Sequence, residues 1–260
     1  MAIALENLVV EDALPAVVIT LNRPDKLNAL SVGLMVELTA ELERQAKRDE
    51  VAVIILKGAG RAFSAGHDLK ELVAKTLDEE RSTFATCERL MATVQSVPQP
   101  VIAAVHGIAT AAGCQLVASC DLAVAASDAR FATNGIRNGI FCYTPMVPVS
   151  RAIGRKRALE MVLTGNFIDA ETAERWGLVN RVVPPDQLDA AVMELATTIG
   201  SLSPVAVRTG KAAFYQQVEL PQEAAYGLMT EAIACNALSE DAQEGMSAFL
   251  EKRKPTWKGR

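Results

Sequence analysis

The sequence predicts an α/β fold that gives way to helices alone, and two observations carry this prediction. Short apolar runs of strand length alternate with helix-like segments up to about residue 183, which is typical of α/β proteins. From Asp186 onward the strand-like runs stop, and apolar residues recur at spacings of three and four. The predicted helices of this last part are 188–202, 204–217, 222–237 and 240–252. We therefore expect a core over residues 1–200 and a helical region over residues 201–260.

The elements of the first half of the core follow from periodicity and capping. Apolar, β-branched runs predict strands, and a turn at Glu11–Asp12 separates the first two strands. Ser31 is a good N-cap for the first helix. Pro98 and Pro100 end the second helix, because proline removes a main-chain donor and cannot continue a helix. The expected elements are strands at 5–10 and 16–21, a helix from Ser31 to about Arg48, a strand at 51–56 and a helix at 78–96.

The composition excludes several classes of protein. A formal net charge of −5 without a basic stripe argues against nucleic acid as the main partner. The two histidines form no zinc motif and the five cysteines show no CxxC spacing, so we expect no metal, and free thiols in a reducing compartment. No apolar run reaches the roughly eighteen residues that span a bilayer. The N-terminus also lacks secretory or transit-peptide character. We expect a cytoplasmic protein that does not bind membranes.

Two stretches place small residues directly after a buried strand. The run 101–105 leads into Thr110-Ala111-Ala112-Gly113, and a helix-length segment at 114–119 and a strand at 122–126 follow. The run 51–56 ends in KGAGRAFSAGHDLK, residues 57–70. Small residues before a helix let a ligand approach the main chain and leave N–H groups free for negative charge. Two such donors could converge on one oxygen, which is what stabilising a thioester enolate requires.

Six segments, taken in chain order, carry a resemblance to a known family. They are LNRPDKLNAL, RAFSAGHDLKE, PVIAAVHGIATAAGCQLVASCDLAVAA, ALEMVLTG, AERWGLVNRVVP and EGMSAFLEKRKPTW. Together they cover essentially the whole chain, which resembles the enoyl-CoA hydratase/isomerase (crotonase) superfamily. The resemblance implies a spiral core of ββα turns, an acyl-CoA thioester as the ligand, and no cofactor beyond the CoA of the substrate. It also implies that the C-terminal helices trimerise and cover a neighbouring active site, giving a homotrimer or a dimer of trimers.

The resemblance also assigns the residues of a site. It places two oxyanion donors on the main-chain N–H groups of His67 and Ala112, and leaves open whether the His67 imidazole takes part in the chemistry. The implied contacts to CoA are Lys26, Ala65, Asp68, Leu69, Lys70, Phe249 and Lys252, with Leu69 against the purine and the last two near the adenine end or the 3′-phosphate. For the three lysines, a solvent-exposed side chain without a ligand is the alternative.

Both glutamates that hydratases of this superfamily use are missing. The resemblance aligns their positions with Gln115 and Gly135. Glutamine can position water but cannot take its proton, and glycine can do neither. Each lost acid/base role reduces the rate by about a hundred- to ten-thousand-fold. We therefore do not expect efficient hydration of crotonyl-CoA.

Other side chains could supply the acid or base. Tyr143 lies in the expected substrate-facing loop, where decarboxylating members of the superfamily carry a tyrosine, although it could merely fill the pocket. Asn134, Asn138 and Cys142 share that region, and Glu88 lies on the helix before Pro98, where a solvated position is the alternative. Three hypotheses stay open: an enolate-stabilising enzyme of the hydratase/isomerase type, a decarboxylase, isomerase or thioester hydrolase that uses Tyr143 or Glu88, and an acyl-CoA-binding protein without catalysis.

Overall fold

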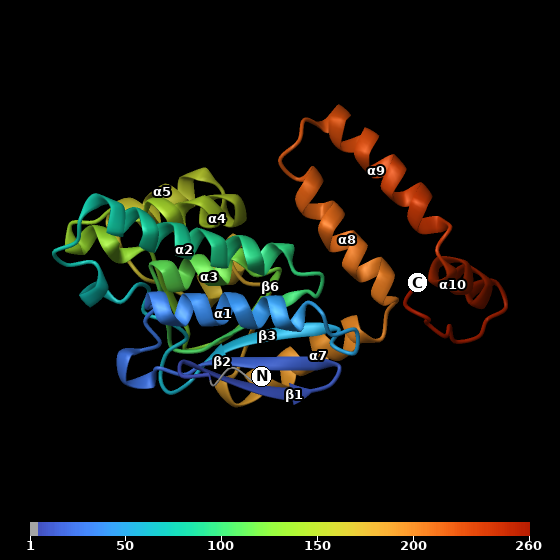
Figure 1. The fold of residues 1–260 in the computed structure, drawn as a ribbon, viewed down its shortest axis with the longest axis horizontal. Helices are drawn as coiled ribbons and strands as arrows, with labels where there is room; N and C mark the ends of the chain where they lie inside the picture. The colour runs from blue at the N-terminus through green and yellow to red at the C-terminus, as the bar shows by residue number, and fades with distance from the viewer. Residues whose placement is uncertain (1–4) are drawn as a thin grey trace.

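The computed structural model describes residues 5–260, and a six-stranded sheet forms the base of its main body (Figure 1). The strand order is β1-β2-β3-β4-β6-β9, with β1 and β2 antiparallel and the later pairs parallel. The strands are β1 Leu8–Ala13, β2 Ala16–Leu21, β3 Val53–Gly58, β4 Val101–Val105, β6 Leu122–Ala126 and β9 Arg181–Val183. Parallel neighbours need long crossover connections, and helices supply most of them.

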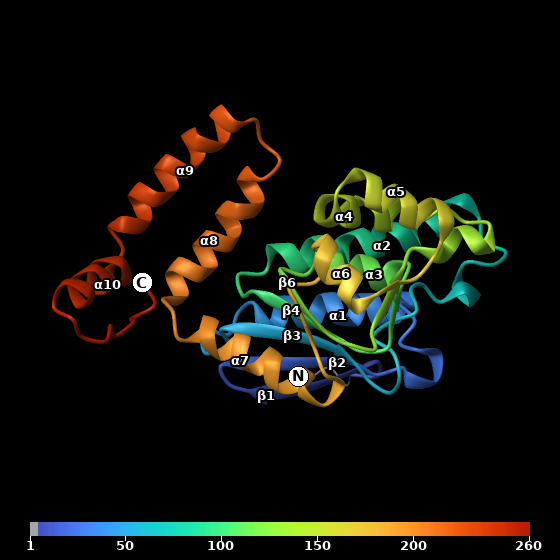
Figure 2. The same cartoon turned by 180° about the vertical axis from the view of Figure 1, so that it is seen from behind.

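Helices cover both faces of this sheet. They are α1 Val32–Gln45, α2 Leu77–Ser96 and α3 Ala112–Ser119 on one face and α7 Leu188–Gly200 on the other (Figures 1 and 2). In β3, Ile54 and Leu56 belong to the larger core with α1 to α3, whereas Val53 and Ile55 belong to a second core with α7. Because both faces of β3 are buried, the strand is a continuous apolar run instead of an alternating one.

A second, three-stranded sheet supports the small-residue stretch that precedes α3. Its order is β5-β7-β8, with β5 and β7 parallel and β7 and β8 antiparallel. These strands are β5 Ile108–Thr110, β7 Arg130–Ala132 and β8 Ile168–Asp169. The other elements of the body are η1 Pro24–Lys26, η2 Leu69–Glu71, η3 Asn134–Asn138, α4 Tyr143–Ile153, α5 Arg155–Thr164, α6 Ala170–Trp176 and η4 Pro185–Gln187.

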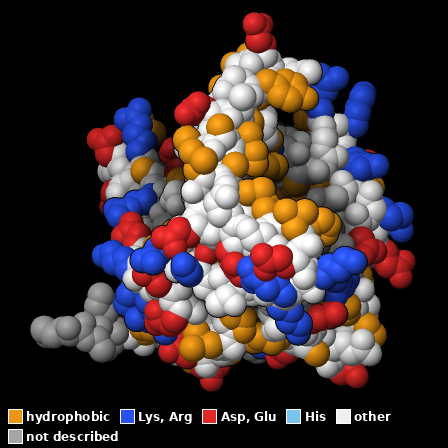
Figure 3. Space-filling view, turned by 90° about the vertical axis from the view of Figure 1, so that its right-hand side faces the viewer, with side chains coloured by type: hydrophobic (Ala, Val, Ile, Leu, Met, Phe, Trp, Pro, Cys, Tyr) orange, Lys and Arg blue, Asp and Glu red, His pale blue; other side chains and the backbone are white. Residues whose placement is uncertain are grey.

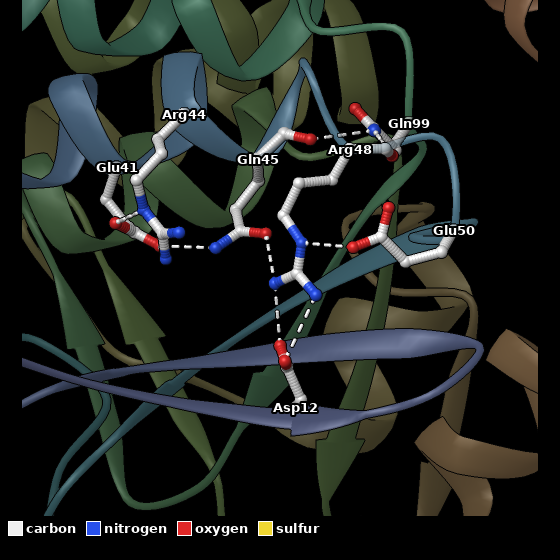
Figure 4. Close-up of polar contacts among 7 residues, drawn as sticks. All are labelled: Asp12, Glu41, Arg44, Gln45, Arg48, Glu50 and Gln99. Carbon is white, nitrogen blue, oxygen red and sulfur yellow. Dashed lines mark hydrogen bonds and ion pairs between the residues drawn. The ribbon is translucent and has the colours of Figure 1, made fainter.

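A polar network fixes the path from α1 into β3 (Figure 4). Arg48 donates from Nη1 to the Asp12 carboxylate and from Nε to the Glu50 carboxylate, at 2.7 Å in both cases. The Gln99 amide donates to the carbonyls of Gln45 and Arg48 at 3.0 and 3.2 Å. The hydrogen bond from Arg48 lowers the pKa of Asp12. The network therefore joins the edge strand β1, the end of α1 and the loop before β4.

The three C-terminal helices extend away from the body (Figures 1 and 2). They are α8 Pro204–Gln217, α9 Gln222–Ala237 and α10 Glu240–Leu250. Neither α8 nor α9 contains a buried residue, and large apolar side chains such as Phe214 and Ile233 are 54% and 64% exposed. Figure 3 shows hydrophobic side chains grouped on this end of the molecule. The region therefore has apolar surface but no core of its own.

Most predicted elements are present within a few residues of their expected bounds. The α/β core and the four helices from α7 to α10 confirm the predicted fold class. The first strand was placed wrongly: β1 runs through Glu11–Asp12, where we expected a turn, because its ladder with β2 continues to the pair Ala13↔Ala16. Strands β5, β7 and β8 were missed, since they are only two or three residues long. The boundary expected at residue 200 falls between α7 and α8 and stays a prediction, and residues 1–4 of the expected core lie outside the described part.

Within residues 5–260 no single helix is long and apolar enough to cross a membrane. The bent pair of segments Pro185–Gly200 and Pro204–Gln217, taken together, has the length and composition to do so. The same part of the chain holds no group of three or more His, Cys, Asp or Glu side chains arranged for a metal ion. Four cysteines are buried and Cys235 is exposed, all as free thiols.

Candidate active site

The two small-residue stretches lie side by side. The Ser64 N–H donates to the Ile108 carbonyl at 3.1 Å, and the Thr110 N–H donates back to the Ser64 carbonyl at 2.9 Å. The Thr110 hydroxyl also donates to the Ala65 carbonyl at 3.0 Å. These bonds extend the pairing of β5 onto the loop after β3, so that the ends of both stretches meet.

Two glycines allow this close approach. Gly66 has φ +91°, and a Cβ there would lie 2.8 Å from the Thr110 carbonyl oxygen. A Cβ on Gly113 would lie 2.3 Å from the Ser64 carbonyl oxygen. Both clashes are with main-chain atoms, which cannot move aside as a flexible side chain can. Contact therefore requires glycine at both positions, and the positive φ requires it at Gly66 as well.

The two stretches leave two main-chain donors unpaired at their junction. Among the described residues, neither the His67 N–H nor the Ala112 N–H makes a hydrogen bond. Ala112 is the first residue of α3, and its nitrogen lies 3.2 Å from the position of a Cβ on Gly66. Ala111 before it has φ +49°, a conformation that costs a non-glycine residue energy and is common at functional sites. The N-terminus of α3 thus lies beside Gly66, the residue before His67, and both His67 and Ala112 line the same cavity.

A cavity of about 460 Å³ opens at this junction. The predicted site residues that line it are Ala65, His67, Leu69, Ala112, Asn134, Gly135, Asn138, Cys142 and Tyr143. Leu72 from the η2 loop, Phe84 from α2 and Ile140 and Phe141 from the loop before α4 add apolar surface. No Asp, Glu, Lys or Arg is among its lining residues. The cavity is therefore apolar with a few neutral polar groups, as small-molecule sites usually are.

The His67 imidazole is largely buried at the cavity wall. Its ring lies edge-on to Phe84, with ring centroids 5.4 Å apart. Both ring nitrogens are buried without a hydrogen-bond partner among the described residues. Burial lowers the pKa of His67, and the Leu30 backbone and the Glu71 charge oppose this shift without reversing it. The neutral imidazole is therefore the favoured form.

Of the two positions where hydratases carry glutamate, one is buried outside the cavity lining and the other belongs to the lining. Gln115 is buried under the cavity, where its Oε1 is 3.9 Å from the Cys87 sulfur on α2, and it is not a lining residue. Gly135 lines the cavity, but a Cβ there would lie 2.6 Å from the Ile140 carbonyl oxygen and 2.9 Å from the Cys142 sulfur. The loop before α4 thus occupies the space through which a side chain at residue 135 would leave the main chain.

Cys142 and Tyr143 both line the cavity but differ in exposure to solvent. Cys142 is buried, and burial raises the pKa of its thiol, so it is not an activated nucleophile. Tyr143 was expected in a loop but is the first residue of α4, 67% exposed and 4.9 Å from Phe141 between ring centroids. Pro145 near the start of this helix fits a first turn, where a missing N–H costs little. Tyr143 therefore stands at the cavity mouth.

Several predicted residues lie outside the cavity lining. Asp68 caps η2 and pairs with Arg23 at 3.0 Å, while Lys26 and Lys70 are exposed. Glu88 is exposed on α2 and does not line the cavity. Phe249 is 82% exposed and, with Lys252, belongs to the opposite end of the molecule (Figure 1). Within one chain, the C-terminal residues and the cavity are not brought together.

Asn28 holds the loops of the site together, and it was not among the residues predicted for the site. Asn28 is fully buried, and its side-chain amide donates to the carbonyls of Ala59 and Ala62 at 2.9 and 2.7 Å while its Oδ1 accepts from Arg23 N–H at 2.9 Å. Ser64 adds a bond from its hydroxyl to the Asn28 carbonyl at 2.9 Å. In the sequence Asn28 is one polar residue in a loop that looked solvated. Its burial is visible only in the folded chain.

Comparisons with known proteins agree with this architecture. The family model for enoyl-CoA hydratase/isomerase matches residues 15–260, and the chain belongs to this family. The mouse enoyl-CoA hydratase domain-containing protein 3, mitochondrial, is 46% identical over 240 residues, covering 92% of this chain and 80% of the mouse protein. A crystal structure of an enoyl-CoA hydratase from Mycobacterium smegmatis has a TM-score of 0.95 at 47% identity, covering 96% and 98% of the two chains. The crystal structure of the human enoyl coenzyme A hydratase domain-containing protein 3 has a TM-score of 0.95 at 43% identity, covering 97% and 100%.

These comparisons confirm the family and the crotonase-like fold and correct one expectation. The expected cytoplasmic location is contradicted, because relatives from mouse, rat and human at 45% to 46% identity are named as mitochondrial proteins. That expectation used only the absence of a recognisable targeting segment, which is a weak argument about location. The roles of the individual site residues stay predictions.

Proposed function

We propose that the protein binds an acyl-CoA thioester in this cavity and stabilises the enolate of the acyl group between the main-chain N–H groups of His67 and Ala112. The observation that carries the proposal is the meeting of these two unpaired donors at the wall of a cavity without charged lining residues. Two fixed donors aimed at one oxygen stabilise negative charge strongly where water is excluded. The N-terminus of α3 adds its partial positive charge.

The CoA part of the ligand would lie outside the cavity, along the surface that carries η1 and η2. Leu69 is 50% exposed at the cavity edge and offers an apolar contact for the purine. Lys26 and Lys70 are exposed cations on the same two helical turns and could reach phosphates. The Asp68–Arg23 ion pair at 3.0 Å joins the two turns. Because the Asp68 carboxylate is paired with Arg23, we do not assign it a direct contact with CoA.

Efficient water addition is not part of this proposal. Hydration needs one group to deprotonate water and one to protonate the α-carbon, and no carboxylate lines the cavity. Gln115 faces Cys87, and the carbonyl of Ile140 and the sulfur of Cys142 crowd Gly135. An enolate formed without added water fits this set of residues better, as in isomerisation or α-proton exchange.

Decarboxylation of a malonyl-type thioester is the second candidate, and the uncharged lining of the cavity favours it. A carboxylate moved into a site without a paired cation is destabilised, and its loss as CO₂ leaves the same enolate. Tyr143 at the mouth could then return a proton to the α-carbon. Use of Glu88 as the acid or base has no such support, because this side chain is exposed and outside the cavity lining.

The first experiment is incubation of the protein with crotonyl-CoA or malonyl-CoA in deuterated water, followed by mass spectrometry of the CoA products. We expect little hydrated product from crotonyl-CoA; deuterated acetyl-CoA from malonyl-CoA would establish the decarboxylase. Rapid hydration would contradict the argument from the absent carboxylates. Binding without turnover of any acyl-CoA tested would instead favour a non-catalytic binding protein.

A variant tests the oxyanion site itself. Ala112→Val adds two methyl groups at a fully buried cavity residue, and we expect turnover to fall by at least about a hundredfold, as after loss of one oxyanion donor. Ala85→Val on the exposed side of α2 is the matched control and should leave turnover unchanged. Full activity in Ala112→Val would overturn the proposed site.

The exposed apolar surface of the C-terminal helices supports a homo-oligomer, a trimer or a dimer of trimers. In such an assembly Phe249 and Lys252 would approach the cavity of a neighbouring copy. Ile233→Asp on α9 should lower the mass measured by light scattering, whereas Leu14→Asp at the equally exposed β1–β2 turn should not. An unchanged mass in both variants would remove α9 from the interface.

A further inference from the structure

The lining of the cavity contains three side chains with a titratable proton, His67, Cys142 and Tyr143. Imidazole is the side-chain type whose ordinary pKa lies closest to neutral pH. Burial raises the pKa of the Cys142 thiol, which removes it as a base, and Tyr143 is 67% exposed at the mouth. His67 is therefore the side chain within the cavity wall best suited to exchange a proton.

The hydrogen-bonding state of His67 is unusual for a folded protein. Nδ1 and Nε2 are both buried and both lack a partner among the described residues. Leaving a buried polar atom without a hydrogen bond destabilises the folded state, and such atoms are rare in native structures. A neutral imidazole has one donor and one acceptor nitrogen, and neither makes a hydrogen bond of ordinary geometry here, although the Leu30 backbone lies close enough to raise the pKa of the ring. Because the ring lines the cavity, a turn about its side-chain bonds would bring a nitrogen to atoms that enter there.

The surroundings of the ring keep it neutral. Phe84 of α2 packs against it edge-on, the Leu30 backbone lies before α1, and Glu71 of η2 is the charged side chain whose field reaches it. The Glu71 carboxylate is occupied, because it accepts the Val32 N–H at 2.7 Å. Since burial outweighs both raising influences, His67 keeps a lowered pKa and enters the reaction as a base.

We propose that the His67 imidazole is the base that removes a proton from the α-carbon of the bound acyl thioester, an inference that rests on the proposed acyl-thioester site. The Cα–H bond breaks and an N–H bond forms on the ring. The electron pair of the broken bond forms a double bond to the carbonyl carbon, and the carbonyl oxygen becomes the enolate oxygen between the two main-chain donors. The imidazolium exchanges this proton with solvent and then delivers a proton, or a deuteron in deuterated water, to the α- or γ-carbon.

This assignment gives one residue two tasks through two different groups. The main-chain N–H of His67 binds the oxygen, and its imidazole exchanges the proton on the α-carbon, which is two bonds from that oxygen. Because both ring nitrogens are shielded in this structure, the step includes a turn of the ring about its side-chain bonds toward the acyl chain. Since a proton goes back to carbon, no water, metal or further reactant is consumed.

The test uses trans-3-hexenoyl-CoA as the probe and the full chain in deuterated water. Incorporation of deuterium at the α-carbon is followed by mass spectrometry, and formation of the conjugated 2-enoyl thioester is followed by absorbance. His67→Gln keeps the main-chain N–H but cannot exchange a proton. We expect kcat to fall by about 10²- to 10⁴-fold, the usual contribution of a general base, with KM changed by less than about threefold. His106→Gln, at a strand end where Nε2 contacts the Gly60 carbonyl at 2.9 Å, is the matched control and should leave both constants unchanged.

A pH profile of the unmodified protein provides a second readout that does not depend on any variant. A base must be deprotonated, so kcat/KM should fall on the acid side with an apparent pKa below 6.5, and this limb should be absent from the residual activity of His67→Gln. Exchange by His67→Gln within threefold of the unmodified protein would overturn the role of the imidazole and leave the proposed site standing. Binding of the thioester by the unmodified protein without any exchange would overturn the role of the imidazole, and failure to decarboxylate malonyl-CoA as well would overturn the proposed oxyanion site.

Discussion

The α/β body and the C-terminal helices contain similar apolar residues but use them in opposite ways. In the body, strands such as β3 and β4 are buried on both faces, and their apolar side chains form two continuous cores. In α8 and α9 no residue is buried, and apolar side chains such as Tyr226 and Ile233 face outward. The body thus completes its own packing, whereas the helices have surface that only a partner can cover.

A buried polar anchor ties α8 to the body, in addition to the exposed pair between Arg208 and Asp49. Lys211 pairs with Asp121 at 2.7 Å and donates to the Val94 and Gln99 carbonyls at 2.9 Å. The Tyr215 hydroxyl adds a bond to Asp121 at 2.8 Å. The side chains of Lys211 and Asp121 are only 6% and 13% exposed, so this pair is shielded from water. Since α8 and α9 contain no buried residue, directional polar bonds contribute more to holding α8 on the body than apolar burial does.

The largest expected effect on stability comes from breaking this anchor. Lys211→Met leaves the buried Asp121 charge unpaired, and removing one partner of a buried ion pair typically costs about 3–5 kcal/mol. The matched control is Arg208→Gln, three residues earlier on α8, because Arg208 pairs at 2.8 Å with an Asp49 side chain that is 96% exposed. Such a surface pair contributes about 0–1 kcal/mol. Urea unfolding of the two variants measures the difference, and equal losses would show that the anchor does not matter.

Replacing a glycine by alanine should change the free energy of unfolding in opposite directions in the body and in α8. Gly113→Ala places a Cβ 2.3 Å from the Ser64 carbonyl oxygen, and overpacking of this kind costs about 1–3 kcal/mol. It should also reduce turnover, since it separates the two stretches of the site. Gly210→Ala in α8 has no atom within 4 Å of the new Cβ and should stabilise the helix by about 0.5–1 kcal/mol. The measurement is the free energy of unfolding for each variant. A loss of stability in Gly210→Ala would mean that another copy covers this position.

The same contrast explains what the sequence could predict about the fold. Apolar spacing of three and four predicts α8 and α9 correctly as helices, because that pattern reports periodicity alone. The spacing does not tell which partner covers the apolar residues, and within this chain many of them are exposed. Strands β5 and β7, at three residues each, are too short for any period to be recognised, although they position Thr110 and Ala111.

The site was predictable where it depends on main-chain geometry and unpredictable where it depends on side-chain packing. Gly66 and Gly113 indicated close approach of two strand ends, and the structure brings those ends together. The burial of both His67 ring nitrogens and the crowding of Gly135 by the loop at Ile140 arise from distant segments of the chain. No local pattern contains that information, because it depends on how α2 and the loop before α4 pack around the cavity.

The smallest expected effect is a pH dependence of stability that belongs to the body alone. Burial holds the pKa of His67 below its ordinary 6.5, so the unfolded chain binds a proton that the folded chain does not. Stability is therefore constant above about pH 6.5 and falls as the pH decreases from there toward the folded pKa. Carboxylates with lowered pKa values, such as Asp12 and Asp68, lose their contribution only below their ordinary value of 3.8, so the range between pH 5 and 6.5 isolates the histidine. Urea unfolding across this range should show a slope in the unmodified protein and none in His67→Gln. An equal slope in both would assign the effect to other groups and would mean that the imidazole takes up its proton without cost in the folded state.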